Sequence, residues 1–367
     1  MDVAMDRRAF LRWTVGTGAM LLACPGSLWK ALAREQPDEI YRRRAPYLWA
    51  FYKRHPEDYR LTAAAHWAHG SISDVIMGTP FDKDAITAAD TRFVAQANAL
   101  LQRPARVEPK QTYVGPAFAR LAPLAPKVID WTHELHEALY DLMADDRLTE
   151  AERLRSIQEE TDYYLSEPGL AFSPAPLDVI VNERVKLMEQ PWFKAFRTQW
   201  PSSTGLFWAF HWWHPAVYEA QVMYWEGQRA AILKIDEVFR REVVPNPPNR
   251  MLLSRDIMPR FSRMAPEAAN IFDNLHQFHG IVYDILASPL VKDKQAEVYR
   301  MIGLMRTRPG DRERALAEAT PFPHPDLDPL VYDTWMWTGQ GEMGRIMGMG
   351  TGKMEMKEHR RPGHEQH

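Results

Sequence analysis

Paired histidines are the residues of this chain whose type and spacing are best suited to chemistry. Of its 13 histidines, eight form pairs in which the second follows the first by three residues. The four pairs are His66/His69, His133/His136, His211/His214 and His276/His279. On a helix, residues three apart lie on one face, so both imidazoles of a pair point to the same neighbour. Imidazole suits iron, copper, zinc and haem iron, and the spacing therefore predicts a cofactor site. The alternative is structural: imidazoles in a tryptophan-rich interior that hydrogen-bond to Asp, Tyr or backbone groups.

Acidic residues accompany the pairs at fixed distances. Asp130 and Asp273 lie three residues before a first histidine, which makes them candidate metal ligands. A carboxylate beside imidazole favours iron, manganese or zinc over copper(I). A second set lies five residues after the second histidine of each pair: Asp74, Asp141, Glu219 and Asp284. These four are interpreted either as acceptors behind the ligands, which fix the imidazole tautomer, or as helix caps and ion-pair partners.

Tyrosines precede three of these four acidic residues, at Tyr140, Tyr218 and Tyr283, and the first motif has Ser73 instead. Seven residues after the first histidine, each tyrosine returns to nearly the same stripe of a helix. Tyr140 and Tyr283 follow the two pairs that also carry an upstream aspartate. They are the candidate catalytic residues.

Glycine or proline follows the second histidine in three of the four motifs, at Gly70, Pro215 and Gly280. Inside a helix these residues cost about 1 to 3 kcal/mol. They predict either a kink or close backbone approach, as a macrocycle or substrate channel requires, or the end of a helix at that point.

An internal repeat organises the elements that carry these motifs. The segment from Pro46 to His69 matches the segment from Pro191 to His214 at an offset of 145 residues. A second pair of segments, 118–144 and 261–287, matches at an offset of 143. So many identities at constant spacing predict an internal duplication. The predicted repeats are residues 34–165 and 191–306, with a linker or crossover at 166–190.

Apolar residues around the motifs recur at three- and four-residue steps, which is typical of helices. Strand-like alternation is scarce. The sequence therefore predicts an all-α fold: a duplicated helical bundle with a pseudo-two-fold four-helix core, peripheral helices and a flexible C-terminal tail. Residues 307–367 form a predicted extension rich in Pro, Met and His.

Residues 1–33 are interpreted as an export signal. The run from Arg7 to Arg12 resembles the twin-arginine signal, and the apolar stretch after it is too short to span a bilayer. Processing is expected either after Ala33 or by lipidation at Cys24. The resemblance implies the twin-arginine export machinery as a partner, a periplasmic location with a possible lipid anchor, and folding around a cofactor before export.

Composition excludes several classes of protein. The formal net charge of -3 provides no basic field for nucleic acid. Cys24 is the only cysteine, so the mature chain offers no disulfide, thiolate site or haem c attachment motif. The most apolar later segment, 205–225, is interrupted by polar residues, so no transmembrane segment is predicted. Hydrolase nucleophile, phosphate-loop and zinc-protease motifs do not occur.

The sequence leaves three functions open. The first is an exported redox protein or oxidoreductase that holds haem b or an iron, manganese or copper ion and meets a periplasmic redox partner. The second is a periplasmic copper carrier or assembly factor, whose capture arm would be the methionines and histidines of residues 343–367. The alternative is that this tail is a disordered segment with a biased composition. The third is a non-catalytic subunit of an exported enzyme.

Overall fold

The computed structural model describes residues 50–104, 109–223, 226–248, 250–317 and 330. Most of them lie in helices, and these ranges contain no β-strand beyond one isolated bridge between Phe172 and Arg306. The predicted all-α class is confirmed. The predicted signal at 1–33 and the methionine- and histidine-rich segment at 343–367 lie outside the described residues.

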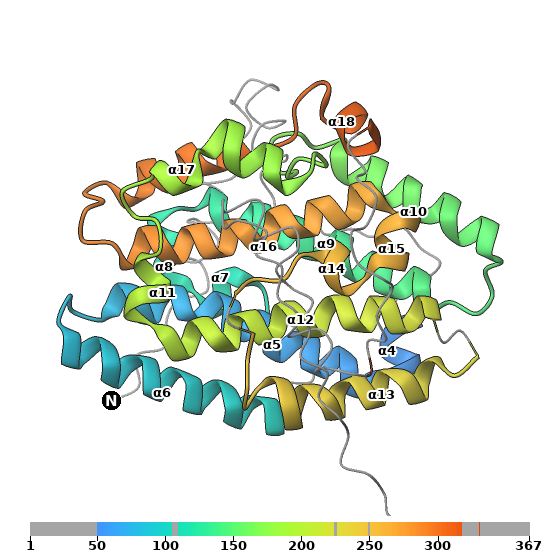
Figure 1. Cartoon of the computed structure of the whole chain (residues 1–367), viewed down its shortest axis with the longest axis horizontal. Helices are drawn as coiled ribbons and strands as arrows, with labels where there is room; N and C mark the ends of the chain where they lie inside the picture. The colour runs from blue at the N-terminus through green and yellow to red at the C-terminus, as the bar shows by residue number, and fades with distance from the viewer. Residues whose placement is uncertain (1–49, 105–108, 224–225, 249, 318–329, 331–367) are drawn as a thin grey trace, which may run out of the picture. The chain divides into compact units, whose positions relative to one another are not determined.

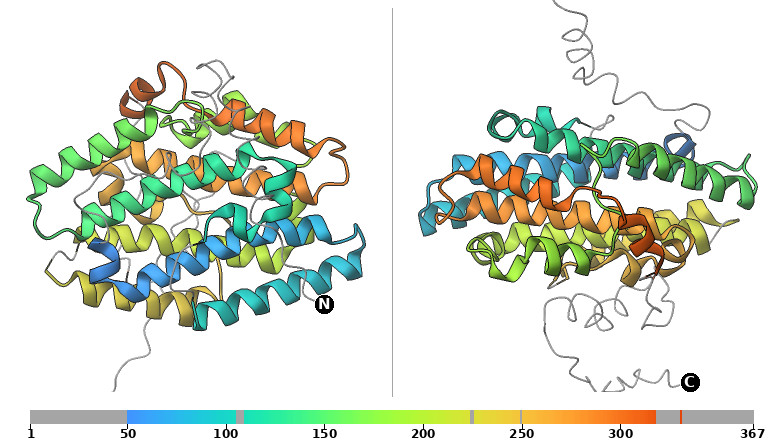
Figure 2. Two further views of the ribbon diagram at one scale, coloured as in Figure 1. Left: turned by 180° about the vertical axis from the view of Figure 1, so that it is seen from behind. Right: turned by 90° about the horizontal axis from the view of Figure 1, so that it is seen from above.

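Four long helices carry the histidine pairs and lie at the centre of the described part (Figures 1 and 2). They are α5 (Pro56–Gly78), α9 (Leu124–Ala144), α12 (Pro201–Met223) and α16 (Pro266–Ala287). Helices α5 and α16 start with a proline in the first turn, where a missing backbone N–H costs nothing. Helix α16 packs against α5 and α9, and α12 packs against the same two helices. Each long helix therefore borders on two others.

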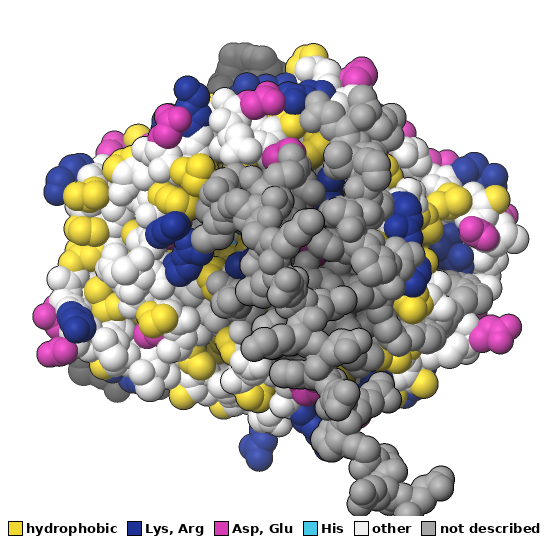
Figure 3. Space-filling model, viewed as in Figure 1, with side chains coloured by type: hydrophobic (Ala, Val, Ile, Leu, Met, Phe, Trp, Pro, Cys, Tyr) yellow, Lys and Arg dark blue, Asp and Glu magenta, His cyan; other side chains and the backbone are white. Residues whose placement is uncertain are grey.

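Shorter elements surround these four. In the first part of the chain they are α4 (Ala50–Arg54), α6 (Lys83–Gln102), α7 (Gln111–Val114), α8 (Pro116–Leu121) and α10 (Glu150–Leu165). In the second part they are α11 (Ala195–Gln199), α13 (Gln228–Val238), α14 (Ser254–Ile257), α15 (Pro259–Met264), α17 (Lys294–Met305) and α18 (Asp311–Ala317). The described residues also form two π-helical turns, η1 (Val179–Val185) and η3 (Phe239–Val243), and the 3-10 turn η2 (Leu187–Glu189). Charges of both signs are scattered over the face in Figure 3.

Helix boundaries recur at the offsets found in the sequence. Helix α12 begins and ends 145 residues after α5, and α11 begins 145 residues after α4. Helices α14 and α15 begin and end 143 residues after α7 and α8. Residues at such paired positions are called equivalent below.

The histidine helices continue through the residues that suggested a boundary. Gly70, Pro215 and Gly280 all lie inside α5, α12 and α16, so the interpretation as helix ends is wrong. Gly70 serves close approach: a β-carbon there would lie 2.2 Å from Val114 Cγ2 and 2.8 Å from Gln111 Oε1. At Gly280 the nearest atom would lie 3.9 Å away, an ordinary contact.

The segment predicted as a linker is partly buried in the protein. Its residues 171–177 are all buried. A buried loop needs partners for its backbone groups. The side-chain amide of Asn274 on α16 supplies them, because it donates to the carbonyl oxygens of Ser173 (2.8 Å) and Ala175 (3.0 Å).

Membrane-spanning helices were not predicted after residue 33. Over the ranges that the structure describes, no helix combines the length and the apolar character that crossing a bilayer requires.

Candidate metal centre

The eight paired histidines meet in the centre of the four long helices. All of them are buried, with exposed fractions from 0 to 6%. Centroids of neighbouring rings lie between 3.7 and 6.5 Å apart, and the contacts link all eight into one network. The structure thus brings together every histidine that the sequence singled out as a ligand.

Distances divide the network into two groups of four rings. Group 1 consists of His66, His133, His136 and His214, and group 2 consists of His69, His211, His276 and His279. Neighbouring centroids lie 3.7–5.6 Å apart within the groups and 5.9–6.5 Å apart between them. Each group takes its histidines from three helices and from both parts of the chain. No i, i+3 pair from α5 or α12 stays together.

The distances between ring centroids are similar in the two groups, although the angles between the rings differ. His66 and His133 of group 1 stack at 3.7 Å, and the equivalent His211 and His276 of group 2 lie 4.1 Å apart. Similarly, the distance is 4.9 Å between His136 and His214 in group 1 and 5.2 Å between the equivalent His279 and His69 in group 2.

Burial favours the neutral form of seven of these imidazoles. It lowers the pKa of His69, His133, His136, His211, His214, His276 and His279, and for His276 the value falls to about 3. Neighbouring histidines lower these pKa values further, since two adjacent positive rings would repel. A neutral imidazole has one N–H donor and one nitrogen lone pair, and the lone pair is what a metal ion needs.

Group 2 contains most of the ring nitrogens that lack a partner. Both nitrogens of His69, His211 and His279 are buried without a hydrogen-bond partner in the described part of the chain. In group 1 the same holds only for Nδ1 of His136, and Nδ1 of His214 lies 3.1 Å from the hydroxyl of Tyr140. Buried polar atoms almost always have a partner, because each one left without costs about 1 to 3 kcal/mol. Group 2 brings three such rings together, and each of them has two nitrogens available to a ligand.

The rings do not converge on one point as they stand. Within the described ranges, no three His, Cys, Asp or Glu side chains are arranged to hold one metal ion. The rings of His69 and His211, for example, lie in nearly parallel planes, at 15° to each other. Their separation of 5.4 Å nevertheless matches two imidazoles on one tetrahedral ion, which lie roughly 5 Å apart given metal–nitrogen bonds of about 2 Å.

The acidic residues that follow the pairs bind the starts of short helices. The carboxylate of Asp74 accepts from the backbone N–H groups of Ala117 and Phe118 in α8, both at 2.8 Å. At the equivalent place, Glu219 accepts from Arg260 and Phe261 in α15.

The other two acidic residues of that set do the same. Asp141 accepts from Phe51 in α4, and Asp284 accepts from Phe196 in α11, both at 2.8 Å. These bonds agree with the interpretation of all four acidic residues as helix caps.

The two aspartates predicted as metal ligands make similar bonds. Asp130 accepts from the backbone N–H of Gln111 at the start of α7 (3.1 Å), and Asp273 from that of Ser254 at the start of α14 (2.8 Å). Burial raises the pKa of Asp273 to about 7. Six carboxylates thus orient six short helices around the long ones. The sequence showed their spacing but not these partners, which lie 19 to 90 residues away.

The candidate catalytic tyrosines bond to histidine backbone groups across the centre. Tyr283 donates to the carbonyl oxygen of His69 (2.8 Å), and the equivalent Tyr140 donates to that of His214 (3.1 Å). Tyr218 makes the same bond to His136 (2.6 Å). Burial raises the pKa of Tyr140 and Tyr283 well above the usual value. Both therefore remain protonated, a state suited to positioning the histidine helices.

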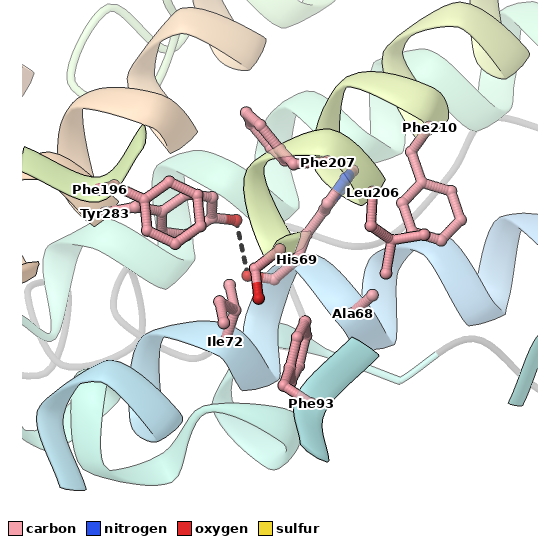
Figure 4. A pocket seen from close by; sticks show the side chains of 10 residues that line it. Ala68, His69, Ile72, Phe93, Phe196, Leu206, Phe207, Phe210 and Tyr283 are labelled. Atoms are coloured by element: carbon pink, nitrogen blue, oxygen red, sulfur yellow. Dashed lines mark hydrogen bonds between the residues drawn. The ribbon is translucent and has the colours of Figure 1, made fainter. Parts of the chain in front are cut away.

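A small pocket lies beside His69, between α5 and α12 (Figure 4). Its volume of about 10 Å³ is close to the least that holds one water molecule. A haem needs on the order of several hundred Å³. In addition, the rings of each group touch one another directly, which leaves no room for a macrocycle between them. The histidine network as packed does not fit haem b.

Sequence reasoning missed this pocket. Its aromatic walls, Phe93, Phe196, Phe207 and Phe210, come from three helices. One signal was present: the motifs His66-Trp-Ala-His69 and His211-Trp-Trp-His214 differ at Ala68, which lines the pocket.

Comparisons with protein-family models, with curated proteins and with solved structures found no match to this chain.

Proposed function

We propose that this chain is an exported metal-binding redox protein whose metal ion is held by group 2. One observation carries the proposal: His69, His211 and His279 lie together with both ring nitrogens buried and without a partner. A structural role predicts the opposite, since imidazoles that serve the core are hydrogen-bonded. The ring centroid of His276 lies 4.1 Å from that of His211, so rotation of the ring would make His276 available as the fourth donor.

Copper is the metal that these donors favour among iron, manganese and copper. The acidic residues beside the histidines bond to helix starts, so the donor set is neutral imidazole. A cation in a dry interior is costly, and the cost grows with the square of its charge, which favours copper(I) over divalent ions. Copper also binds nitrogen donors more tightly than iron or manganese does. A bound copper would supply one-electron chemistry, which suits a protein with a periplasmic redox partner.

Internal duplication accounts for the paired geometry. The sequence matches, the recurring helix bounds and the equivalent contacts in groups 1 and 2 all support it. Under this proposal an ancestral site of four imidazoles was copied, and its two descendants then diverged. Group 1 acquired hydrogen bonds such as Tyr140–His214, and group 2 kept its nitrogens available.

Burial favours a resident ion over a transported one. A carrier releases its metal to a partner, whereas the histidines of group 2 are at most 6% exposed. The twin-arginine-like signal agrees with this, because a route for folded proteins suits a metal loaded in the cytoplasm. The sequence of the methionine- and histidine-rich tail supports the carrier alternative, which predicts copper binding that is lost when residues 343–367 are deleted.

Elemental analysis of the purified full chain tests the proposal. We expect at least one copper per chain, still present after deletion of residues 343–367. His211→Gln and His279→Gln should each remove the ion from group 2. The equivalent variants in group 1, His66→Gln and His136→Gln, are the matched controls and should keep it.

Two results would contradict this proposal. Protein without stoichiometric metal would leave the third function, a non-catalytic subunit with structural histidines. Equal loss of metal from both sets of variants would show that the ion is not confined to group 2.

A further inference from the structure

The pocket beside His69 lies on the group 2 side of the histidine network. Ala68 lines it, and the equivalent residue beside His214 is Trp213. Trp213 is completely buried, and its indole N–H donates to Asp236 at 2.7 Å. The indole thus occupies its place next to group 1, while a single methyl group stands at the matching place next to group 2.

Other lining residues differ between the two sides in the opposite sense. Phe207 and Phe210 border the pocket, and their equivalents are the smaller Thr62 and Ala65. The large side chains are thus Phe207 and Phe210 on the group 2 side and Trp213 on the group 1 side. Near group 1 the central indole fills the space, whereas near group 2 aromatic walls surround a space that stays open.

Polar groups of the pocket are largely engaged elsewhere. The hydroxyl of Ser203 donates to Asp90, and the hydroxyl of Tyr283 donates to the carbonyl oxygen of His69. Among the lining residues, the ring of His69 is then the polar group without a partner, and it is available to a ligand in the pocket. Figure 4 shows His69 between the aromatic side chains of α12 and the pocket residues of α5.

We infer that this pocket admits a small apolar molecule of the dioxygen class to group 2, and that Trp213 bars the equivalent place beside group 1. An internal water needs two to four polar partners, more than this pocket offers. An apolar diatomic molecule needs none, and the pocket holds about one small molecule. The pocket itself does not depend on the proposed metal, but delivery of the molecule to copper rests on the proposed function.

Methyl relaxation under dissolved oxygen tests the pocket in metal-free full-length protein. Ile72 and Leu206 line the pocket, and their equivalents Val217 and Leu61 are the matched controls near Trp213. We expect oxygen to relax the methyl groups of Ile72 and Leu206 several-fold more than those of Val217 and Leu61. Ala68→Val, which fills the pocket, should remove the difference, and Phe93→Leu, which enlarges it, should increase it. Equal relaxation at all four residues in the unmodified protein would overturn the inference.

A second measurement separates this inference from the proposed function. In copper-loaded, reduced protein, Ala68→Val should slow reoxidation by dioxygen several-fold while the copper content stays unchanged. If the relaxation difference is present but no copper binds, the pocket stands and the proposed metal is wrong. If copper binds but reoxidation is equally fast in both proteins, dioxygen reaches the metal by another route and the inference is wrong.

Discussion

The hydroxyl of Tyr283 donates a hydrogen bond of 2.8 Å to the backbone carbonyl oxygen of His69, 214 residues earlier in the chain. The bond ties α16 to α5 beside group 2. Its counterpart, Tyr140 to His214, ties α9 to α12 beside group 1 and adds a contact with the ring nitrogen of His214. Tyr283 thus links two helices, whereas Tyr140 links two helices and also contacts the ring of His214, a candidate ligand.

Removing the two tyrosine hydroxyls should have different effects. Tyr283→Phe loses one neutral hydrogen bond, and we expect a loss of about 0.5 to 1.5 kcal/mol in unfolding free energy. Tyr140→Phe also takes the partner of His214 Nδ1 away and should cost more. Urea unfolding of metal-free protein measures both. An equal cost for the two variants would mean that the contact with the His214 ring contributes nothing.

Gly70 and Gly280 provide a matched test of close helix packing. In Gly70→Ala the new methyl group would meet Val114 at 2.2 Å, and we expect a loss of about 1 to 3 kcal/mol. In Gly280→Ala the nearest atom is 3.9 Å away, so alanine should instead stabilise the helix by roughly 0.5 to 1 kcal/mol. Thermal unfolding of the two variants would reveal the opposite signs. Destabilisation of both by the same amount would contradict the packing described here.

Replacing Asp74 tests whether this carboxylate caps a helix or supports a metal ligand. Asp74→Ala removes the acceptor of two backbone N–H groups in α8, and we expect a loss of about 1 to 2 kcal/mol in stability. The metal content and affinity should stay as in the unmodified protein. A carboxylate behind a ligand would behave differently, because its removal typically lowers metal affinity 10- to 100-fold. Copper titration together with chemical unfolding separates the two roles.

Acid should destabilise the metal-free protein through its buried histidines. Burial lowers the pKa of His211 well below 6.5, so the folded state binds fewer protons than the unfolded state once the pH falls below about 6.5. Stability from this residue is complete above that pH and falls by up to about 1.4 kcal/mol per pH unit as the pH drops towards the folded pKa. Asp273 and Asp284, with pKa values of about 7, act in the opposite direction.

His211→Leu isolates the contribution of one ring. Its unfolding free energy should fall less steeply than that of the unmodified protein between pH 6 and 4, by up to about 1.4 kcal/mol per pH unit. At pH 7, without metal, the variant should be as stable or more stable, because a buried ring with two unpartnered nitrogens is gone. Denaturant unfolding at several pH values measures this, and parallel curves would contradict a neutral, buried His211.

Sequence spacing predicted the helices and the placing of both histidines of a pair on one helix face, because both follow from periodicity within one helix. It could not predict which rings become neighbours: His66 stacks on His133 and not on its pair partner His69, and this depends on how the helices cross. The partners of Asp74 and Asp130 were also hidden, since helices of four to six residues leave no periodic signal. Whether the helix continues through Pro215 was left open by the sequence, because only the packing of the folded protein decides whether a local penalty of about 3 kcal/mol is outweighed.

The assembly of group 2 from distant parts of the chain has a consequence for when a metal can bind during biosynthesis. His69 emerges from the ribosome early, but His279 follows only after 210 further residues have been made. A nascent first half carries three of the four histidines of group 1 but only His69 of group 2. A single imidazole cannot retain the ion. Under the proposed function, loading at group 2 must therefore follow translation of α16, and a chain that is exported after folding would have only a short interval for acquiring its metal.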